Sequence, residues 1–160
     1  MTKPERPDAS AGGPAADAAR AVTGASRVPV EARSYEIDPY GHVNNAVFVN
    51  WLEHGRLAWL RDRGMTYTSI PETFGVHVVV VSMRVDYRAE VVLGDRLTIV
   101  SDVVRIGTSS FTFAQRIEFD GGRVAAEGEV TMVATRNGRS ATIPGPLRAK
   151  LVPEESGIAR

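Results

Sequence analysis

The chain has 160 residues, of which 43% are hydrophobic and 24% are charged, and its formal net charge is zero at pH 7. A chain of this length suits one domain with a sizeable core, so it needs neither disulfides nor a metal for stability. It contains no cysteine, which excludes thiolate metal sites and cysteine nucleophiles, and its balanced charge gives no chain-wide footprint for nucleic acid.

Residues 1–27 contain no aromatic residue, no leucine and no isoleucine. Such a segment buries too little apolar surface to offset its ordering entropy, so we expect a disordered tail. It also lacks the apolar run of a signal peptide, and no stretch of the chain approaches the ~20 apolar residues that span a bilayer. Because the absence of cysteine fits a reducing compartment, the expected location is the cytoplasm, without membrane association.

The following residues predict a strand, a turn and a long helix. Apolar and polar residues alternate over residues 28–37, which indicates a strand. Asp38-Pro39-Tyr40-Gly41 is typical of a turn, and Asn44 or Asn45 then caps a helix over residues 46–63. The apolar residues of this helix spread too widely for one surface stripe, so we expect the helix to be largely buried.

Four further strands are predicted, over residues 77–88, 96–106, 110–119 and 123–134. In the first of them the residues that share one face are Val79, Val81, Met83, Val85 and Tyr87. The short connections between these strands favour antiparallel pairing in a meander. One long helix with an antiparallel sheet gives an α+β domain in which the sheet curls around the helix.

The end of the chain is irregular because it contains several prolines, although residues 147–151 are compatible with a short turn of helix. We therefore expect one domain over residues 28–151, between the tail at 1–27 and a C-terminal tail over residues 152–160. The chain contains no internal repeat.

Polar residues cluster just before the predicted helix, where Asp38, His42, Asn44 and Asn45 follow one another closely. A helix N-terminus presents unpaired N–H groups and a partial positive charge, which can polarise a carbonyl oxygen. A carboxylate beside these groups can attack that carbonyl or activate a water. The segment could thus form an acyl-transfer site without serine or cysteine, although an ordinary turn and helix cap give the same pattern.

The same segment resembles the signature of the hotdog acyl thioesterases, which include the 4-hydroxybenzoyl-CoA thioesterase-like enzymes and the plant acyl-ACP thioesterases. The residues that carry the resemblance are Asp38-Pro39-Tyr40-Gly41-His42-Val43-Asn44-Asn45, Phe48, Trp51, Glu53 and Arg56. Further markers downstream are Val85-Asp86-Tyr87, Gly94-Asp95-Arg96-Leu97, Gly107-Thr108-Ser109-Ser110, Ile143-Pro144 and Leu147-Arg148. The resemblance extends from about Val28 to Leu151 and implies the hotdog fold, a sheet wrapped around one central helix.

The resemblance also implies an activity, the hydrolysis of acyl-CoA to a free acid and CoA with no cofactor and no metal. Asp38 matches the catalytic carboxylate, which acts as nucleophile or general base, and the backbone N–H of Asn45 matches the amide that polarises the thioester carbonyl. His42 matches a histidine that assists catalysis in the acyl-ACP enzymes, whereas Tyr40 stands where those enzymes have asparagine.

Other residues are expected to support or extend this site. Three residues are candidates to contact and orient the reacting groups without touching the substrate: Tyr40, Asn44 and Glu53. Glu53 could also form an i,i+3 pair with Arg56. The phosphates of CoA usually meet arginine or lysine. The candidates for this contact are Arg84, Arg88, Arg105 and Arg116, although a solvated sheet face explains these residues equally well.

The resemblance implies a homodimer or tetramer with active sites at the subunit interface, which would also protect the sheet edges.

Three alternatives to an acyl-CoA thioesterase stay open: an acyl-ACP thioesterase, a hotdog protein that binds acyl groups without turnover, and a hotdog dehydratase. Aromatic, short branched and medium-chain acyl groups are all compatible with the sequence. The pocket depth depends on how Trp51, Met83, Phe111 and Phe113 pack.

Overall fold

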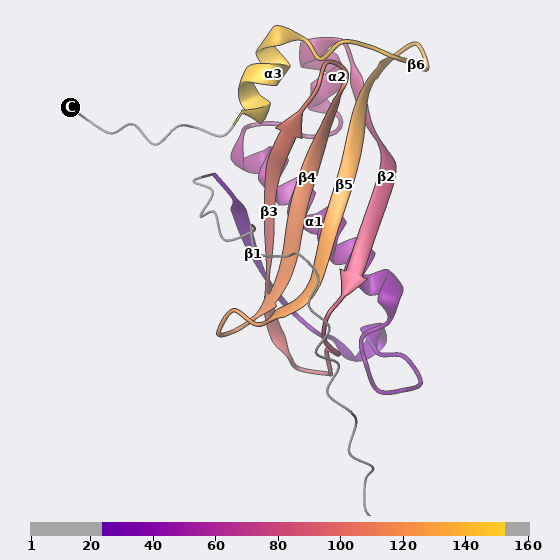
Figure 1. Ribbon diagram of the computed structural model, residues 1–160, viewed down its shortest axis with the longest axis vertical. Coiled ribbons are helices and arrows are strands. Elements are labelled where there is room, and N and C mark those ends of the chain that lie inside the picture. The colour runs from indigo at the N-terminus through magenta and orange to yellow at the C-terminus, as the bar shows by residue number, and fades with distance from the viewer. Residues whose placement is uncertain (1–23, 153–160) are drawn as a thin grey trace, which may run out of the picture.

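The computed structural model describes residues 24–152 (Figure 1). The elements in chain order are β1 (Ser26–Glu31), the 3-10 turn η1 (Ser34–Glu36), α1 (Asn45–Asp62), α2 (Ser69–Phe74), β2 (His77–Tyr87), β3 (Arg96–Ile106), β4 (Ser110–Phe119), β5 (Val124–Arg136), β6 (Arg139–Ser140) and α3 (Gly145–Leu151). Residues 26 and 27, which the sequence placed in the tail, already belong to β1. Residues 1–23 of that expected tail and residues 153–160 of the C-terminal one lie outside the described residues.

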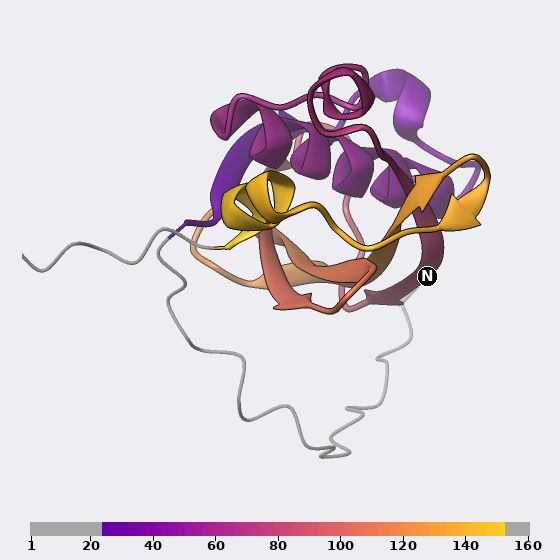
Figure 2. The same ribbon diagram turned by 90° about the horizontal axis from the view of Figure 1, so that it is seen from above.

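The strands form one antiparallel sheet in the order β1-β3-β4-β5-β2, and the short β6 pairs with β5. Figures 1 and 2 show α1 lying along one face of this sheet, which curls around the helix. The predicted α+β hotdog architecture is therefore confirmed.

The expected meander of four strands is wrong in one respect, because β2 does not pair with β3. It pairs with β5, at the opposite edge of the sheet from β1 and β3. The connection from Tyr87 to Arg96 is too long for a tight hairpin, and it carries the chain from the edge strand β2 past β5 and β4 to β3, which lies next to β1. This crossing connection forms one wall of the candidate site.

The long helix begins and ends close to the predicted positions. The Asn44 side chain caps the helix by accepting a hydrogen bond from the N–H of Ala46 at 2.9 Å. At the other end, Gly64 adopts a positive φ of 68°, and the N–H of Met65 returns to the carbonyl of Leu60 at 2.9 Å.

Only one face of α1 is buried, so the expectation of a largely buried helix is wrong. The buried residues recur at intervals of three and four and are Phe48, Trp51, Leu52, Gly55, Arg56, Ala58, Trp59 and Leu60. Glu53 and His54 are exposed on the opposite side. Glycines let the buried face approach the sheet closely, since a Cβ on Gly55 would lie 2.5 Å from Ser101 Oγ.

Two hydrophobic clusters fill the space between α1 and the sheet. One surrounds Trp59, Phe111 and Phe113 and is closed by α3 through Leu147. The other surrounds Phe48, Trp51 and Leu52 and lies beneath the start of α1. Each large side chain buried in this way contributes about 1.5–3 kcal/mol, so the second cluster holds the start of the helix firmly against the sheet.

The predicted shared face of β2 is interrupted. The register against β5 shifts between Val80 and Ser82, so that Val81 lies in a β-bulge. Val78 packs on the core before the bulge, whereas Val79 and Val81 are exposed. Because a bulge inserts one residue, it moves the alternation to the other face, and Met83 and Val85 contact the core after it.

Candidate active site

The loop between η1 and α1 is held at its base by Glu36. This buried carboxylate accepts hydrogen bonds from the backbone N–H of Arg33 at 2.8 Å and from the indole N–H of Trp51 at 3.3 Å. The carbonyl of Glu36 accepts from the N–H of Asn44 at 2.9 Å. The predicted strand over 28–37 therefore ends early, at Glu31, and the chain turns tightly so that residues 37–44 form a closed loop.

Asp38 is oriented by the backbone of this loop. Its Oδ1 accepts hydrogen bonds from the N–H groups of Tyr40 at 2.8 Å and His42 at 3.3 Å, while its own N–H donates to the carbonyl of His42 at 2.7 Å. Gly41 permits this turn with a φ of 85°. Within residues 24–152, no group donates to Oδ2. One carboxylate oxygen is thus fixed and the other is available for chemistry.

The start of α1 is pinned by the end of β2. The hydroxyl of Tyr87 donates to the carbonyl of Asn45 at 3.1 Å, and its ring meets Phe48 edge to face with centroids 5.3 Å apart. Asn45 is the first helical residue, so no intrahelical acceptor exists for its backbone N–H, and the described residues supply no other. This N–H is a fixed, unoccupied donor at the positive end of the helix.

His42 contacts a residue that the sequence reasoning missed. Its Nε2 lies 3.3 Å from Oε2 of Glu90, in the connection between β2 and β3. The N–H of Val43 donates to the carbonyl of Val91 at 2.8 Å and ties the loop to this connection. No local pattern marks Glu90 in the sequence, because only the crossing of this connection beneath the loop brings the two side chains together.

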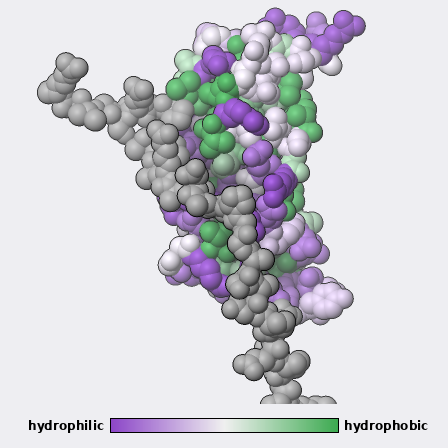
Figure 3. All heavy atoms as spheres, in the orientation of Figure 1, coloured by the Kyte–Doolittle hydropathy of each residue, from purple (hydrophilic) through white to green (hydrophobic). Residues whose placement is uncertain are grey.

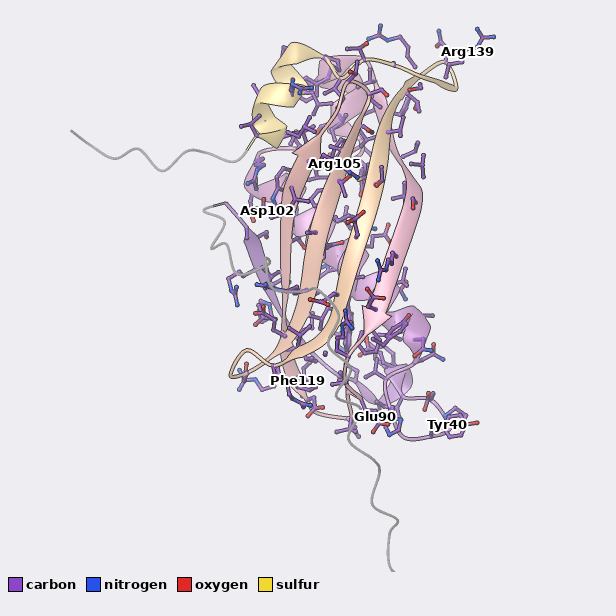
Figure 4. All side chains as sticks on the ribbon, viewed as in Figure 1. Tyr40, Glu90, Asp102, Arg105, Phe119 and Arg139 are labelled. Carbon is purple, nitrogen blue, oxygen red and sulfur yellow. The ribbon has the colours of Figure 1, made fainter. Side chains whose placement is uncertain are left out.

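These elements surround a cavity of about 590 Å³. Its lining residues are Asp38, His42, Val43, Asn45, Phe48, Tyr87, Arg88, Ala89, Glu90, Val91 and Arg123. The structure therefore brings Asp38, His42 and Asn45 together in one cavity, as the sequence predicted. Figure 4 shows that Tyr40, Glu90 and Phe119 all lie at this end of the molecule, whereas Arg139 lies at the other.

The three expected supporting residues differ in their positions. Asn44 caps the helix and does not line the cavity. Tyr40 is 85% exposed and holds Asp38 through its backbone N–H, not through its phenol. Glu53 is exposed and lies away from the cavity lining, and its expected partner Arg56 is buried against Gln115, with Nη1 and Oε1 2.9 Å apart.

Among the four predicted phosphate ligands, the cavity lining contains only Arg88, whose Nη2 lies 2.8 Å from Oε2 of Glu127. The other three lie elsewhere on the sheet and contact neighbouring side chains: Arg84 contacts Asp86, Arg105 contacts Thr112, and Arg116 contacts Glu118. Arg123, which the sequence reasoning missed, also lines the cavity. The apolar lining comes from Val43, Phe48 and Val91, whereas Trp51, Met83, Phe111 and Phe113 do not line it.

No group of three or more histidine, aspartate or glutamate residues within residues 24–152 is arranged to hold a metal ion. No helix in the same range is long and apolar enough to cross a membrane.

Comparison with known sequences points to one family. Residues 32–151 match the family described as the Thioesterase-like superfamily. The long-chain acyl-CoA thioesterase FadM of Escherichia coli is 32% identical over 129 residues, which cover 76% of this chain and 93% of that protein. The chloroplastic acyl-acyl carrier protein thioesterase ATL3 of Arabidopsis thaliana is 29% identical over 93 residues, 58% of this chain but only 45% of that longer protein.

A solved structure agrees with these sequences. A thioesterase from Thermus thermophilus, crystallised with coenzyme A and zinc, superposes with a TM-score of 0.70 at 31% sequence identity. The match covers 82% of this chain and 95% of that one. The family match over residues 32–151 extends from the end of β1 to the last residue of α3.

Proposed function

Because the chain belongs to the thioesterase-like superfamily, we propose that it hydrolyses acyl-CoA to a free carboxylic acid and CoA at the cavity beside the start of α1. One observation carries this proposal. Asp38, which has one carboxylate oxygen free, and Asn45, which has an unoccupied backbone N–H, line the same cavity, so a nucleophile or base and a carbonyl-binding donor share one site. This combination is what thioester hydrolysis needs.

The chemistry follows from these two groups. The N–H of Asn45 donates to the thioester oxygen and stabilises the negative charge that develops on it. As a general base, Asp38 takes a proton from water as that water attacks the carbonyl carbon, and the proton then passes to the departing thiolate of CoA. As a nucleophile, Asp38 forms an anhydride with the acyl group and expels the thiolate, and water then hydrolyses the anhydride.

His42 and Glu90 give this proposal a third component. Glu90 holds Nε2 of His42, while the backbone N–H of His42 donates to Asp38. The pair therefore fixes the loop that carries the carboxylate, and the imidazole lines the cavity where it can order the attacking water.

CoA is the carrier that we favour. The FadM relative, 93% of which is matched by this chain, is a long-chain acyl-CoA thioesterase. A carrier protein is the second candidate, because plant acyl-ACP thioesterases are also similar to this chain. Rates on acyl-CoA and acyl-ACP with the same acyl group separate the two.

The proposed assembly is a homodimer, or a tetramer built from such dimers. Val79, Val80 and Val81 on β2 are 41%, 44% and 57% exposed, and within residues 24–152 the strand pairs only with β5. Figure 3 shows hydrophobic surface along the upper part of this edge. A second copy that covers these valines would bury an unpaired strand edge and an apolar patch together.

The test of function is free-thiol release from a panel of acyl-CoA esters by the parent protein, Asp38→Asn and Asp62→Asn. We expect Asp38→Asn to lose at least ~100-fold in kcat, because it removes the carboxylate and keeps its size. Asp62→Asn, at the exposed end of α1, is the control and should match the parent. An active Asp38→Asn would refute the assigned role, and hydrolysis of no ester would favour the carrier-protein or binding-only alternatives.

A further inference from the structure

Arg123 contributes a cationic side chain to the lining of the same cavity. It follows the tight β4–β5 turn, in which Gly121 and Gly122 have φ angles of 96° and 88°. The N–H of Phe119 donates to the carbonyl of Arg123 at 2.9 Å and closes the turn. The guanidinium lies over the ring of Phe119, 4.0 Å from its centroid. The turn and the ring together hold this charge at the cavity.

The turn is attached to the connection that carries Glu90. The N–H groups of Arg88 and Ala89 both donate to the carbonyl of Ala125, at 2.8 and 3.1 Å. This contact places the beginning of β5 beside residues 88–91, which is why Arg123 lines the cavity although it is distant in sequence from the catalytic loop. In Figure 4 Phe119 lies at the same end of the molecule as Glu90.

The cavity lining carries side chains of both charges. Asp38 and Glu90 are acidic, and a ligand phosphate would be repelled by them. The guanidinium of Arg88 is engaged by Glu127, and the imidazole of His42 by Glu90. Arg123 is exposed, and no carboxylate or other hydrogen-bond acceptor within residues 24–152 contacts its guanidinium. It is the arginine of the cavity with its donors available.

From this arrangement we infer that Arg123 binds a phosphate of the substrate's carrier, while the thioester lies between Asp38 and Asn45. A guanidinium presents paired N–H donors that match a phosphate, and its stacking on Phe119 reduces the entropy lost on binding. The inference rests on the proposed function for the identity of the carrier. The phosphate belongs either to the phosphopantetheine unit, common to CoA and carrier proteins, or to the nucleotide of CoA alone.

The experiment measures binding without turnover, so that it is independent of catalysis. Dissociation constants of free CoA, 4′-phosphopantetheine and pantetheine are determined by calorimetry for the parent, Arg123→Gln and Arg139→Gln. Arg139 is a matched control, because it is exposed and lies at the opposite end of the molecule (Figure 4). Arg123→Gln should bind CoA about tenfold more weakly and pantetheine equally well, as expected for loss of one charge-assisted contact. Arg139→Gln should bind all three like the parent.

The compounds identify which phosphate is bound. An equal loss for phosphopantetheine and CoA assigns the phosphate shared with carrier proteins, whereas a loss for CoA alone assigns the nucleotide. Unchanged CoA binding by Arg123→Gln, an equal loss in Arg139→Gln, or no CoA binding by the parent would overturn the inference. The proposed hydrolysis can be refuted independently of this inference. If the parent protein binds CoA through Arg123 but releases no thiol, the proposed activity is wrong and the phosphate site stands.

Discussion

Tyr87 connects the end of β2 to the start of α1, so its hydroxyl controls the position of the donor at Asn45. Removing this hydroxyl in Tyr87→Phe keeps the contact with Phe48 but releases the carbonyl of Asn45. Since one hydrogen bond contributes about 0.5–1.5 kcal/mol, we expect kcat to fall up to about tenfold. KM should change less, because the ring that lines the cavity remains.

The control for this variant is Tyr35→Phe, which removes an exposed hydroxyl that accepts a hydrogen bond from the Arg33 side chain. Steady-state kinetics on one acyl-CoA ester would compare the two. Equal kcat values for both variants and the parent would show that the Tyr87 hydroxyl does not position the helix start.

Asp102 is a buried carboxyl on β3, far along the sheet from the cavity lining. Burial raises its pKa, and this outweighs the hydrogen bonds from Val103 and Trp59 and the charge of Arg63, which lower it. Its Oδ2 has no hydrogen-bond partner among the described residues. The folded state therefore binds the proton more tightly than the unfolded state, and Asp102 makes the fold less stable as pH rises above its unfolded pKa of about 3.9.

Asp102→Asn removes this titration. We expect the Tm of the variant, relative to the parent, to increase as pH rises from about 4 to 8, because only the parent must ionise a buried carboxyl. Thermal unfolding at several pH values measures this difference, and every other titrating group cancels in the comparison. A difference in Tm that stays constant over this range would contradict the assignment.

The residues that the sequence predicted for the site are those that adjoin one another in the chain. Asp38, His42 and Asn45 fall within one turn and one helix start, so a local pattern identifies them. Glu90 and Arg123 reach the cavity only through pairing between distant segments. The roles of these two residues depend on tertiary contacts, and no spacing in the sequence encodes them.

The helix packs so closely on the sheet that its contact with β3 requires glycine. A Cβ on Gly55 would lie 2.5 Å from Ser101 Oγ and 2.6 Å from a methyl carbon of Ile99. Gly55→Ala should therefore lower the free energy of unfolding by about 1–3 kcal/mol. Alanine favours helices more than glycine does, but the steric cost of the added methyl group is larger than this gain in helix propensity.

Gly145→Ala is the matched control for Gly55→Ala. Gly145 begins α3, and no atom lies within 4 Å of the position of an added Cβ. Urea unfolding should show Gly145→Ala within about 1 kcal/mol of the parent. An equally stable Gly55→Ala would mean that the helix can shift away from the sheet at little cost.

At the level of elements, the bounds of the strands were predicted more accurately than the pairing between the strands. The bounds of β3 and β4 agree with the prediction because alternation and flanking turns are local signals. The pairing of β2 with β5 is not local, since it depends on where the connection from Tyr87 to Arg96 crosses the sheet. The short helix α2 was missed, as Pro71 and its six-residue length obscure any helical period.

For the whole molecule, the two sides of the curled sheet have different surfaces. The side away from α1 carries ion pairs such as Arg84–Asp86 and Arg88–Glu127, and Figure 3 shows hydrophilic surface over the middle of it. The exposed valines of β2 lie at its edge instead. An apolar edge beside a charged face favours association along the edge, and Tyr87, at the end of the same strand, lines the cavity.

If the proposed dimer forms along β2, this edge strand links assembly to activity. Val80→Lys places a charge on β2 where a second copy would pack, and lysine on an edge strand opposes pairing. We expect the parent to elute as a dimer or tetramer in size-exclusion chromatography with light scattering, and Val80→Lys to shift toward the monomer. If the active site includes the interface, thiol release per chain should fall with that shift and recover as protein concentration rises.

Val104→Lys makes the same chemical change at a similarly exposed position, because Val104 is 55% exposed on β3, away from the β2 edge. It should assemble and react like the parent. A parent that is monomeric, or a Val104→Lys that dissociates as readily as Val80→Lys, would show that the β2 edge is not the interface. A monomeric Val80→Lys with full activity at every concentration would separate assembly from catalysis, since the cavity would then be complete within one chain.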